Sequence, residues 1–391
     1  MDSSSLHPTQ NRSHPFSRPS VSRVRTSLLL QYISSQHTLR FATRQYRQNT
    51  QLTTISLLAR LPYTIQQRLE STTGSAVLTS TRYRPIRSQL FQHITLPSQP
   101  GQPTFSAYWL CRGLEPSAAP LDPTKADVVI YKLHGGAYIF GQPATFFPGF
   151  MFMAEVLKAR GLNVCILSLE YTWAPYATFP TQIEQAVRGY EYLVRGLGVN
   201  PERICVFGES AGGHLVLALL VRLRSMGRTD KPAVAMLMSP WVDLLSQNPH
   251  ASDTSDFLSR ATLDRAAKML LRDTPRRTFQ LYTNFAERVA ARGESWKDIL
   301  ASKTWMSAGE DEFFLRDIVN FYEQAKKDGA DVVLEVEKGG AHVWQGVESV
   351  TSGGQKKFLQ SRPGSSVEGL NPGLTRIASW LADVIDARKQ Y

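Results

Sequence analysis

A serine between glycines is the residue of this chain best suited to nucleophilic chemistry. It is Ser210, in the run Gly208-Glu209-Ser210-Ala211-Gly212. The apolar residues 204–207 before this run predict a short buried strand, and Leu215–Leu220 after it predicts an apolar helix. A strand, a tight turn and a helix in this order form a nucleophile elbow, which holds the serine hydroxyl out at the end of a sheet. The G-x-S-x-G spacing is common by itself, and the strand and helix around it are what predict a nucleophile.

A serine hydroxyl needs a neighbouring base, and His342 is the best candidate among the eight histidines. In folds built on this elbow the three catalytic residues follow one another along the chain as serine, acid and histidine. His342 follows a late strand-like run, whereas the other histidines lie before that region. The alternative is that His342 is a structural histidine, and the elbow favours the catalytic interpretation.

The acid that orients this base is expected in the loop after the next-to-last strand. Residues 307–312 place three adjacent carboxylates there, Glu310, Asp311 and Glu312. Asp311, two residues after a glycine, is the preferred acid, and Glu312 is the alternative because its longer side chain reaches from one residue further on. Asp317 is expected to cap or pair with the helix that follows.

A turn rich in glycine, His134-Gly135-Gly136, follows the first convincing strand. Backbone amides suit an oxyanion hole because they are fixed in place, and glycine lets the backbone approach a ligand closely. We expect the amides of Gly135, Gly136 and Ala211 to form the hole. The alternative interpretation is a plain turn after a strand.

Alternating strand-like and helix-like runs must bring these residues together. The alternation predicts parallel βαβ units in an α/β fold, with looser edge strands in 76–110. The expected strands are 127–133, 163–169, 204–207, 234–238, 304–307 and 332–336, and the expected helices are 150–160, 181–197, 314–327 and 374–388.

Residues 245–300 interrupt this alternation with a polar loop and two helical patterns, at about 255–271 and 278–292. An insertion of this length predicts a helical cap or lid. We expect a single domain at 71–391, with cap contributions from about 55–105 and 245–300, and a helix at 55–69. The Gly/Ser-rich stretch 352–366 is predicted to be a mobile loop.

The formal net charge of +11 is concentrated at the N-terminus. Residues 1–69 contain nine arginines and one acid, which is +8 and leaves +3 for the rest. This balance argues against a nucleic-acid partner for the body of the protein. Residues 1–70 are interpreted as a basic, disordered leader or tail. Their Arg/Ser-rich, acid-poor composition is also typical of a mitochondrial transit peptide, the alternative to a cytoplasmic protein.

No apolar run approaches the roughly 18 residues that span a bilayer, so no transmembrane segment is expected. The three cysteines, Cys111, Cys165 and Cys205, have no metal-like spacing. Two of them lie in apolar strand-like runs, which predicts buried free thiols.

Several of these motifs together resemble the hormone-sensitive-lipase-like group of α/β-hydrolases, the esterase/deacetylase family with an HGG oxyanion loop. The resemblance spans about 127–345 in the family's order, with Glu209 where aspartate is commoner and one extra residue between Gly309 and Asp317. The matching stretches are His134–Tyr138, 171–180, Gly208–Gly213, Ser239–Trp241, Gly309 with Asp311, and His342.

This resemblance implies an α/β-hydrolase fold: a mostly parallel central sheet flanked by helices, with a helical cap. It also implies hydrolysis of carboxylic esters, often of acetyl or other short acyl groups, without a metal or other cofactor. Four aromatic residues beside the expected site are candidates for the substrate pocket, with core packing as the alternative: Tyr138, Phe140, Trp241 and Trp344.

The leading hypothesis is therefore a serine esterase or deacetylase acting on a small or medium hydrophobic ester. An acyltransferase or an amidase such as a formamidase would use the same residues, because the pocket and the access of water choose the acceptor. A hydrolase fold turned into a binding receptor is the remaining hypothesis. Retention of both Ser210 and His342 argues against it.

Overall fold

The chain divides into two units, Met1–Gln51 and Leu52–Tyr391. The computed structural model describes residues 75–96, 105–116, 119–174, 176–247, 256–285 and 294–389, all in the second unit. The predicted leader at 1–70 and the predicted helix at 55–69 lie outside these residues.

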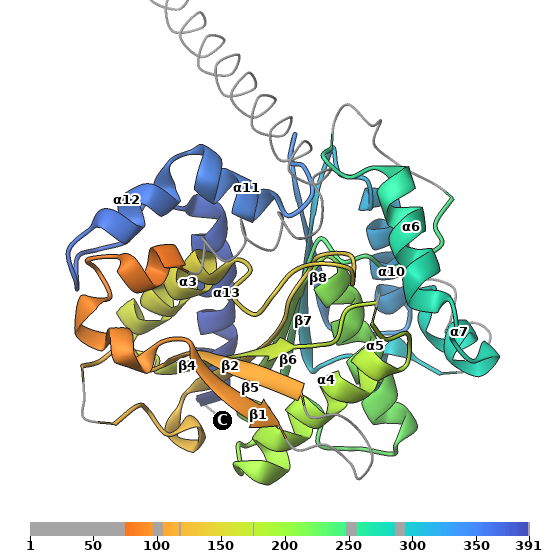
Figure 1. Cartoon of the computed structure of the whole chain (residues 1–391), viewed down its shortest axis with the longest axis horizontal. Helices are drawn as coiled ribbons and strands as arrows, with labels where there is room; N and C mark the ends of the chain where they lie inside the picture. The colour runs from red at the N-terminus through yellow and green to blue at the C-terminus, as the bar shows by residue number, and fades with distance from the viewer. Residues whose placement is uncertain are drawn as a thin grey trace, which may run out of the picture. The chain divides into compact units, whose positions relative to one another are not determined.

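An eight-stranded sheet forms the centre of the second unit (Figure 1). The strands are β1 Gln92–Leu96, β2 Phe105–Arg112, β3 Val128–Leu133, β4 Val164–Glu170, β5 Ile204–Glu209, β6 Val234–Met238, β7 Lys303–Gly309 and β8 Val332–Glu337. Their order is β1-β2-β4-β3-β5-β6-β7-β8, with β2 antiparallel to both of its neighbours and β3 to β8 all parallel. The expected mostly parallel sheet is confirmed. The six strands predicted from the sequence are present, with bounds that differ by at most two residues.

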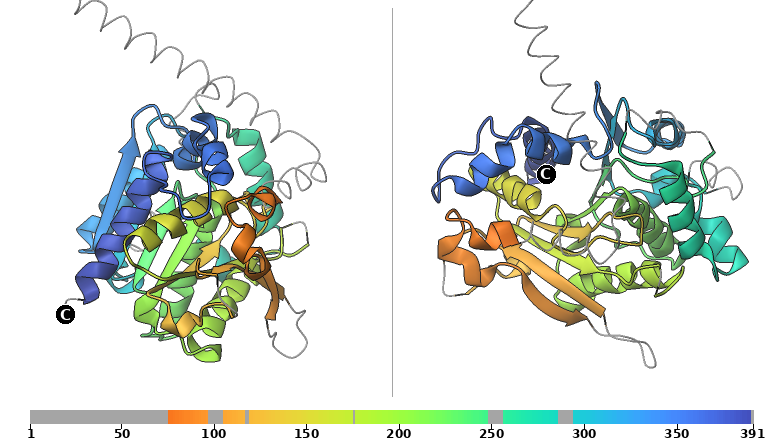
Figure 2. Two further views of the ribbon diagram at one scale, coloured as in Figure 1. Left: turned by 90° about the vertical axis from the view of Figure 1, so that its left-hand side faces the viewer. Right: turned by 45° about the horizontal axis from the view of Figure 1, so that its top comes forward.

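Helices cover both faces of the sheet, as Figures 1 and 2 show. One buried cluster lies on the face covered by α4, α5 and α10, and the other on the face covered by α3 and α13. Val129, Tyr131 and Leu133 of β3 belong to the first cluster, and Val128 and Ile130 belong to the second. Successive strand residues point to opposite faces, so burial on both sides accounts for strands that are apolar throughout. These helices are α3 Phe147–Ala159, α4 Thr181–Glu191, α5 Ala211–Ser225, α10 Leu315–Lys327 and α13 Pro372–Lys389.

The insertion after β6 contains the helices α6 Arg260–Leu271, α7 Arg276–Tyr282 and α9 Trp296–Ile299. α6 buries Leu263, Ala266, Ala267 and Leu270, a helical spacing that places them on one face. The Leu270 carbonyl accepts a hydrogen bond from the Phe179 amide at 3.2 Å, which joins the end of α6 to the loop after β4. The helical character predicted for this insertion is present in its described residues.

The described residues of the N-terminal segment that was predicted to join the cap belong instead to the sheet and to the helical layer on its α3 face. β1 and β2 extend the sheet, and the turn of 3-10 helix η1, Arg84–Gln89, packs on the α3 face through Ile86. The buried Arg82 side chain reinforces this packing by donating to Glu155 of α3 at 2.9 Å and to the Ser365 carbonyl at 2.9 Å.

The prediction of a mobile loop at 352–366 is wrong for much of its length. Helix α11, Trp344–Thr351, runs into this stretch, and α12, Gly354–Gln360, lies inside it. Phe358 of α12 is fully buried and meets the ring of Phe152 edge-on at 5.2 Å. Arg82 also binds Ser361 and Ser365 of this stretch. These contacts hold a segment whose composition predicts a loop.

Among the helices of the described residues, none has the length and apolar character that crossing a bilayer requires. The three cysteines are free and buried, as predicted. Burial raises the pKa of Cys165 to about 12, which keeps this thiol protonated.

Candidate active site

Ser210 lies at the carboxyl end of β5, immediately before α5. Its backbone angles, φ 56° and ψ −120°, fall in a region that non-glycine residues rarely adopt, which costs on the order of 1–3 kcal/mol. A Cβ at Gly208 would lie 2.2 Å from the Gly212 carbonyl oxygen, so the turn excludes side chains there. The side chain of Ser210 is half-buried between the buried residues Glu209 and Ala211. The predicted order of strand, strained serine and helix is present.

Two backbone hydrogen bonds join this turn to the end of β6. The Ser210 amide donates to the Met238 carbonyl at 2.9 Å, and the Trp241 amide donates to the Ser210 carbonyl at 3.1 Å. Ser239, between those two partners, is therefore held beside the elbow. Its hydroxyl donates to Glu312 Oε2 at 2.6 Å and accepts the Val343 amide at 3.0 Å.

These bonds bring Glu312 and His342 to the elbow. Glu312 Oε1 faces His342 Nδ1 at 3.7 Å, with the two side chains 0% and 3% exposed. The other carboxylate oxygen, Oε2, accepts from the Gly309 amide at 2.6 Å as well as from Ser239. A separation of 3.7 Å exceeds a hydrogen bond, and catalytic contacts commonly shorten when substrate binds.

The geometry favours Glu312 over Asp311, the residue preferred from the sequence. Asp311 is only half-buried, and its amide donates to the Gly340 carbonyl at 2.9 Å. The turn after β7, closed by the Glu312 amide on the Gly309 carbonyl at 3.3 Å, directs residue 312 inward to the histidine. The register of this turn makes Glu312 the better candidate for the acid, a choice that the sequence left open.

Burial raises the pKa of Glu312, while His342, Ser239 and the Gly309 amide lower it in part. The His342 ring contacts aromatic edges from two elements, Phe257 at 5.7 Å and Phe314 at 5.2 Å between ring centres. An apolar wall on these sides fixes the orientation of the ring and leaves Glu312 to face Nδ1.

The amides available as donors in the predicted oxyanion loop differ from the expected set at one position. The Gly135 amide, a predicted donor, is already bound to Glu209 Oε1 at 3.0 Å. Within the described residues, the amides of Gly136, Ala137 and Ala211 donate to no protein acceptor. Gly136 and Ala137 have φ values of 110° and 50°, so the backbone departs from the strand conformation of β3 at these residues. Ala137, which the sequence did not suggest, joins Gly136 and Ala211 as a candidate donor.

Glu209, the elbow residue before Ser210, binds the Gly135 amide and also forms a buried ion pair. Its Oε1 atom also lies 3.6 Å from Lys132 Nζ on β3. Burial raises the pKa of Glu209, and the Lys132 charge partly offsets this rise. The Glu209 side chain therefore ties the elbow to the oxyanion loop.

His134, the first residue of the oxyanion loop, helps to hold it in place. It stacks on Tyr171 at 4.1 Å between ring centres, and its Nδ1 faces the Gly135 carbonyl at 2.8 Å.

A second buried histidine, His214 of α5, also anchors the residues after the oxyanion loop, through Tyr138. Its Nε2 lies 2.8 Å from the Tyr282 carbonyl, which can only accept, so Nε2 carries the proton. Nδ1 of the neutral ring then accepts the Tyr138 hydroxyl at 2.8 Å. One histidine thus connects the oxyanion loop, the elbow helix and the end of α7.

The four aromatic pocket candidates lie mainly in the interior. Tyr138 is fully buried and bound to His214, and Trp241 stacks on Phe314 at 5.8 Å. Trp344 is buried, with the Arg376 guanidinium over its ring at 4.8 Å. Phe140 is partly buried against the core. These contacts favour the core interpretation that the sequence kept open.

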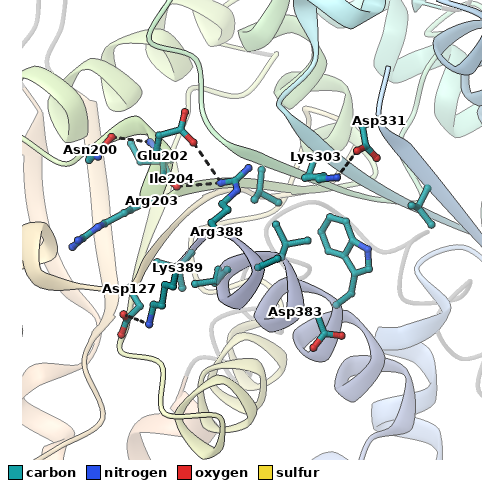
Figure 3. A pocket seen from close by; sticks show the side chains of 17 residues that line it. Asp127, Asn200, Glu202, Arg203, Ile204, Lys303, Asp331, Asp383, Arg388 and Lys389 are labelled. Carbon is teal, nitrogen blue, oxygen red and sulfur yellow. Dashed lines mark hydrogen bonds and ion pairs between the residues drawn. The ribbon is translucent and has the colours of Figure 1, made fainter. Parts of the chain in front are cut away.

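A groove of about 870 Å³ lies at the opposite ends of the strands, where β3, β5, β6 and β7 begin (Figure 3). Six of its charged side chains form three ion pairs: Asp127 with Lys389 at 2.6 Å, Glu202 with Arg388 at 3.8 Å, and Lys303 with Asp331. Its position at the amino ends of the strands separates the groove from the site around Ser210. In the described part of the chain, no group of three or more His, Cys, Asp or Glu side chains could hold a metal ion.

Comparison with known proteins assigns the part of the chain that carries the site to a hydrolase fold. A family model described as an alpha/beta hydrolase fold matches residues 130–346. An acetyl-hydrolase of Streptomyces hygroscopicus is 30% identical over 60% of this chain and 76% of its own length. An ethyl acetate hydrolase of Pseudomonas putida is 27% identical over 33% of this chain and 40% of its own length. A bovine hormone-sensitive lipase is 31% identical over 30% of this chain, but only 15% of its own length is matched.

Solved structures share the fold at lower identity. The crystal structure of an esterase from the bacterial hormone-sensitive lipase family superposes with a TM-score of 0.61 at 24% identity. The match covers 87% of this chain and 98% of that one.

The buried histidines predict a measurable loss of stability in acid. Burial lowers the pKa of His214 to about 3, and burial together with the Lys132 charge lowers that of His134 to about 3. An unfolded histidine titrates near about 6.5, so between these values the unfolded chain binds more protons. The free energy of unfolding therefore falls as pH falls from about 6.5 toward 3.

His214→Gln removes one of these groups. The slope of unfolding free energy against pH, measured by urea unfolding, should decrease by about 1.4 kcal/mol per pH unit between about pH 4 and 6. An unchanged slope at equal unfolding cooperativity would show that His214 is not held neutral.

Proposed function

Because the chain belongs to the alpha/beta hydrolase family, we propose that it is a serine esterase acting on carboxylic esters. The proposed substrates are acetyl and other short-acyl esters of small or medium hydrophobic alcohols, which the names of the acetyl-hydrolase and ethyl acetate hydrolase relatives support. One observation carries the proposal: a strained, half-buried Ser210 is joined through Ser239 to the buried pair of Glu312 and His342.

In the first half of the reaction Ser210 Oγ attacks the carbonyl carbon of the ester. The hydroxyl proton passes to Nε2 of His342, and Glu312 faces the proton that remains on Nδ1. The carbonyl oxygen becomes an oxyanion and accepts the amides of Gly136, Ala137 and Ala211. These amides are fixed before substrate binds, so little reorganisation is needed in the transition state.

Collapse of this intermediate breaks the bond from carbon to the alcohol oxygen. His342 gives its proton to the departing alcohol, which leaves the acyl group on Ser210. In the second half a water molecule attacks the acyl carbon while His342 takes one of its protons. Return of that proton to Ser210 Oγ releases the carboxylic acid and restores the enzyme.

Glu312 acts on the histidine and makes no contact with substrate. Ser239 and the Gly309 amide bind its Oε2, which leaves Oε1 directed at the imidazole. A carboxylate so fixed selects the tautomer with a proton on Nδ1 and stabilises the imidazolium that forms in each half reaction.

The first prediction concerns the nucleophile. Ser210→Ala should lower kcat for p-nitrophenyl acetate by about 10³-fold to 10⁶-fold, because the acyl-enzyme can no longer form. Ser225→Ala removes an exposed hydroxyl at the other end of the same helix and should leave kcat unchanged. Near wild-type turnover by Ser210→Ala would remove this serine from the mechanism.

The second prediction separates the two adjacent acids. Glu312→Gln keeps an acceptor for Ser239 but removes the charge opposite His342, so kcat should fall by about 10²-fold to 10⁴-fold. Asp311→Asn should leave kcat within about threefold, because the Asp311 carboxylate is not the one that faces the imidazole. Steady-state kinetics of both variants give the two kcat values. A larger loss of kcat in Asp311→Asn than in Glu312→Gln would restore Asp311 as the acid.

A further inference from the structure

We propose that Asp256, in the insertion after β6, is a positioning residue that holds the acid and base loops in register. This inference rests on the proposed roles of Ser210, Glu312 and His342. In this proposal the insertion helps to align the site, because one of its carboxylates sets the spacing between the loops that carry Glu312 and His342.

The Asp256 carboxylate binds backbone amides on both loops. Oδ2 accepts the Phe313 amide at 2.8 Å, directly after Glu312 in the chain. Oδ1 accepts the amide of His342 itself at 3.3 Å and the Phe257 amide at 2.7 Å. The Asp256 residue is 7% exposed, so these bonds face little competition from water.

The residues that follow Asp256 continue along the same two loops. The Phe257 ring meets the His342 ring at 5.7 Å, and the Arg260 guanidinium lies 5.3 Å from the centre of the Phe313 ring. Ser259 caps α6 by accepting the Thr262 amide at 3.4 Å, so the start of the helix fixes where this segment runs. The first turn of α6 and the residues before it therefore pack against both loops.

Asp256 does not replace Glu312 as the acid. Its oxygens face backbone amides, whereas Glu312 Oε1 faces Nδ1 of the imidazole. The acid loop follows β7 and the base loop follows β8, so their spacing depends on what joins them. Bonds from a carboxylate to amides are stronger than neutral ones, and a displacement of about 1 Å in a catalytic group can cost about 100-fold in rate.

The test compares Asp256→Asn with a matched variant from the same connection between β6 and β7. An asparagine has one accepting oxygen, so it must give up the amide on one of the two loops. Asp243→Asn is the control, because Asp243 accepts the Leu245 amide at 2.8 Å and the Asn284 side chain at 3.0 Å, both from this connection. Both variants are assayed as full-length protein, with kcat expressed per site titrated by a fluorophosphonate, so that incomplete folding does not mimic a catalytic defect.

We expect Asp256→Asn to lower kcat about 10-fold to 100-fold with KM within about threefold, and Asp243→Asn to keep kcat within about twofold. In a Glu312→Gln background, Asp256→Asn should have little further effect on kcat. The carboxylate that Asp256 aligns with the His342 imidazole is already absent there. Ser239 and the backbone bonds of the turn remain in all of these variants.

Three results would overturn the proposal: kcat per titrated site within twofold of wild type, an equal loss in Asp243→Asn, or a full additional loss in the Glu312→Gln background. Failure of the esterase assignment is distinguishable from these. It would appear as an active Ser210→Ala variant, whereas failure of the present inference leaves Ser210→Ala inactive and Asp256→Asn active.

Discussion

The hydrogen bond from the Ser239 hydroxyl to the Glu312 carboxylate is the contact on which the site depends most. Ser239 is anchored to the nucleophile elbow through the backbone on either side of it, and it also accepts the amide that follows His342. One hydroxyl thereby joins the loops after β6, β7 and β8. A fully buried carboxylate without such donors would carry a large desolvation penalty, and its free oxygen would have no fixed direction.

Backbone strain is concentrated around the same contact. Seven non-glycine residues in the described part of the chain have a positive φ, and five of them surround the site: Ala137, Tyr138, Ser210, Ser239 and Val343. Each such conformation costs on the order of 1–3 kcal/mol and persists only where the surroundings determine it. The apolar clusters on both faces of the sheet, with the buried side chains of Glu209 and His214, supply that constraint.

The sequence predicts the parts of this arrangement that repeat over many residues or follow a fixed order. Uniformly apolar strands predict the sheet, which the structure confirms. The Gly-x-Ser-x-Gly turn predicts Ser210 as the nucleophile, and chain order predicts His342 as the base. The choice between Asp311 and Glu312 depends on one turn whose register no local pattern reveals. The same limit applies to Gly135, because only the fold shows that Glu209 occupies its amide. No local sequence pattern points to Asp256, because its proposed role arises from contacts with Phe313 and His342. These residues lie 57 and 86 positions further along the chain.

The most direct test of this account locates the reactive atom. Protein labelled with a fluorophosphonate is digested, and the modified peptide is identified by mass spectrometry in wild type and in His342→Ala. The account predicts one adduct, on Ser210, whose rate of formation falls sharply without the imidazole that activates the hydroxyl. An adduct on another residue, or labelling of Ser210 at the same rate in both proteins, would contradict it.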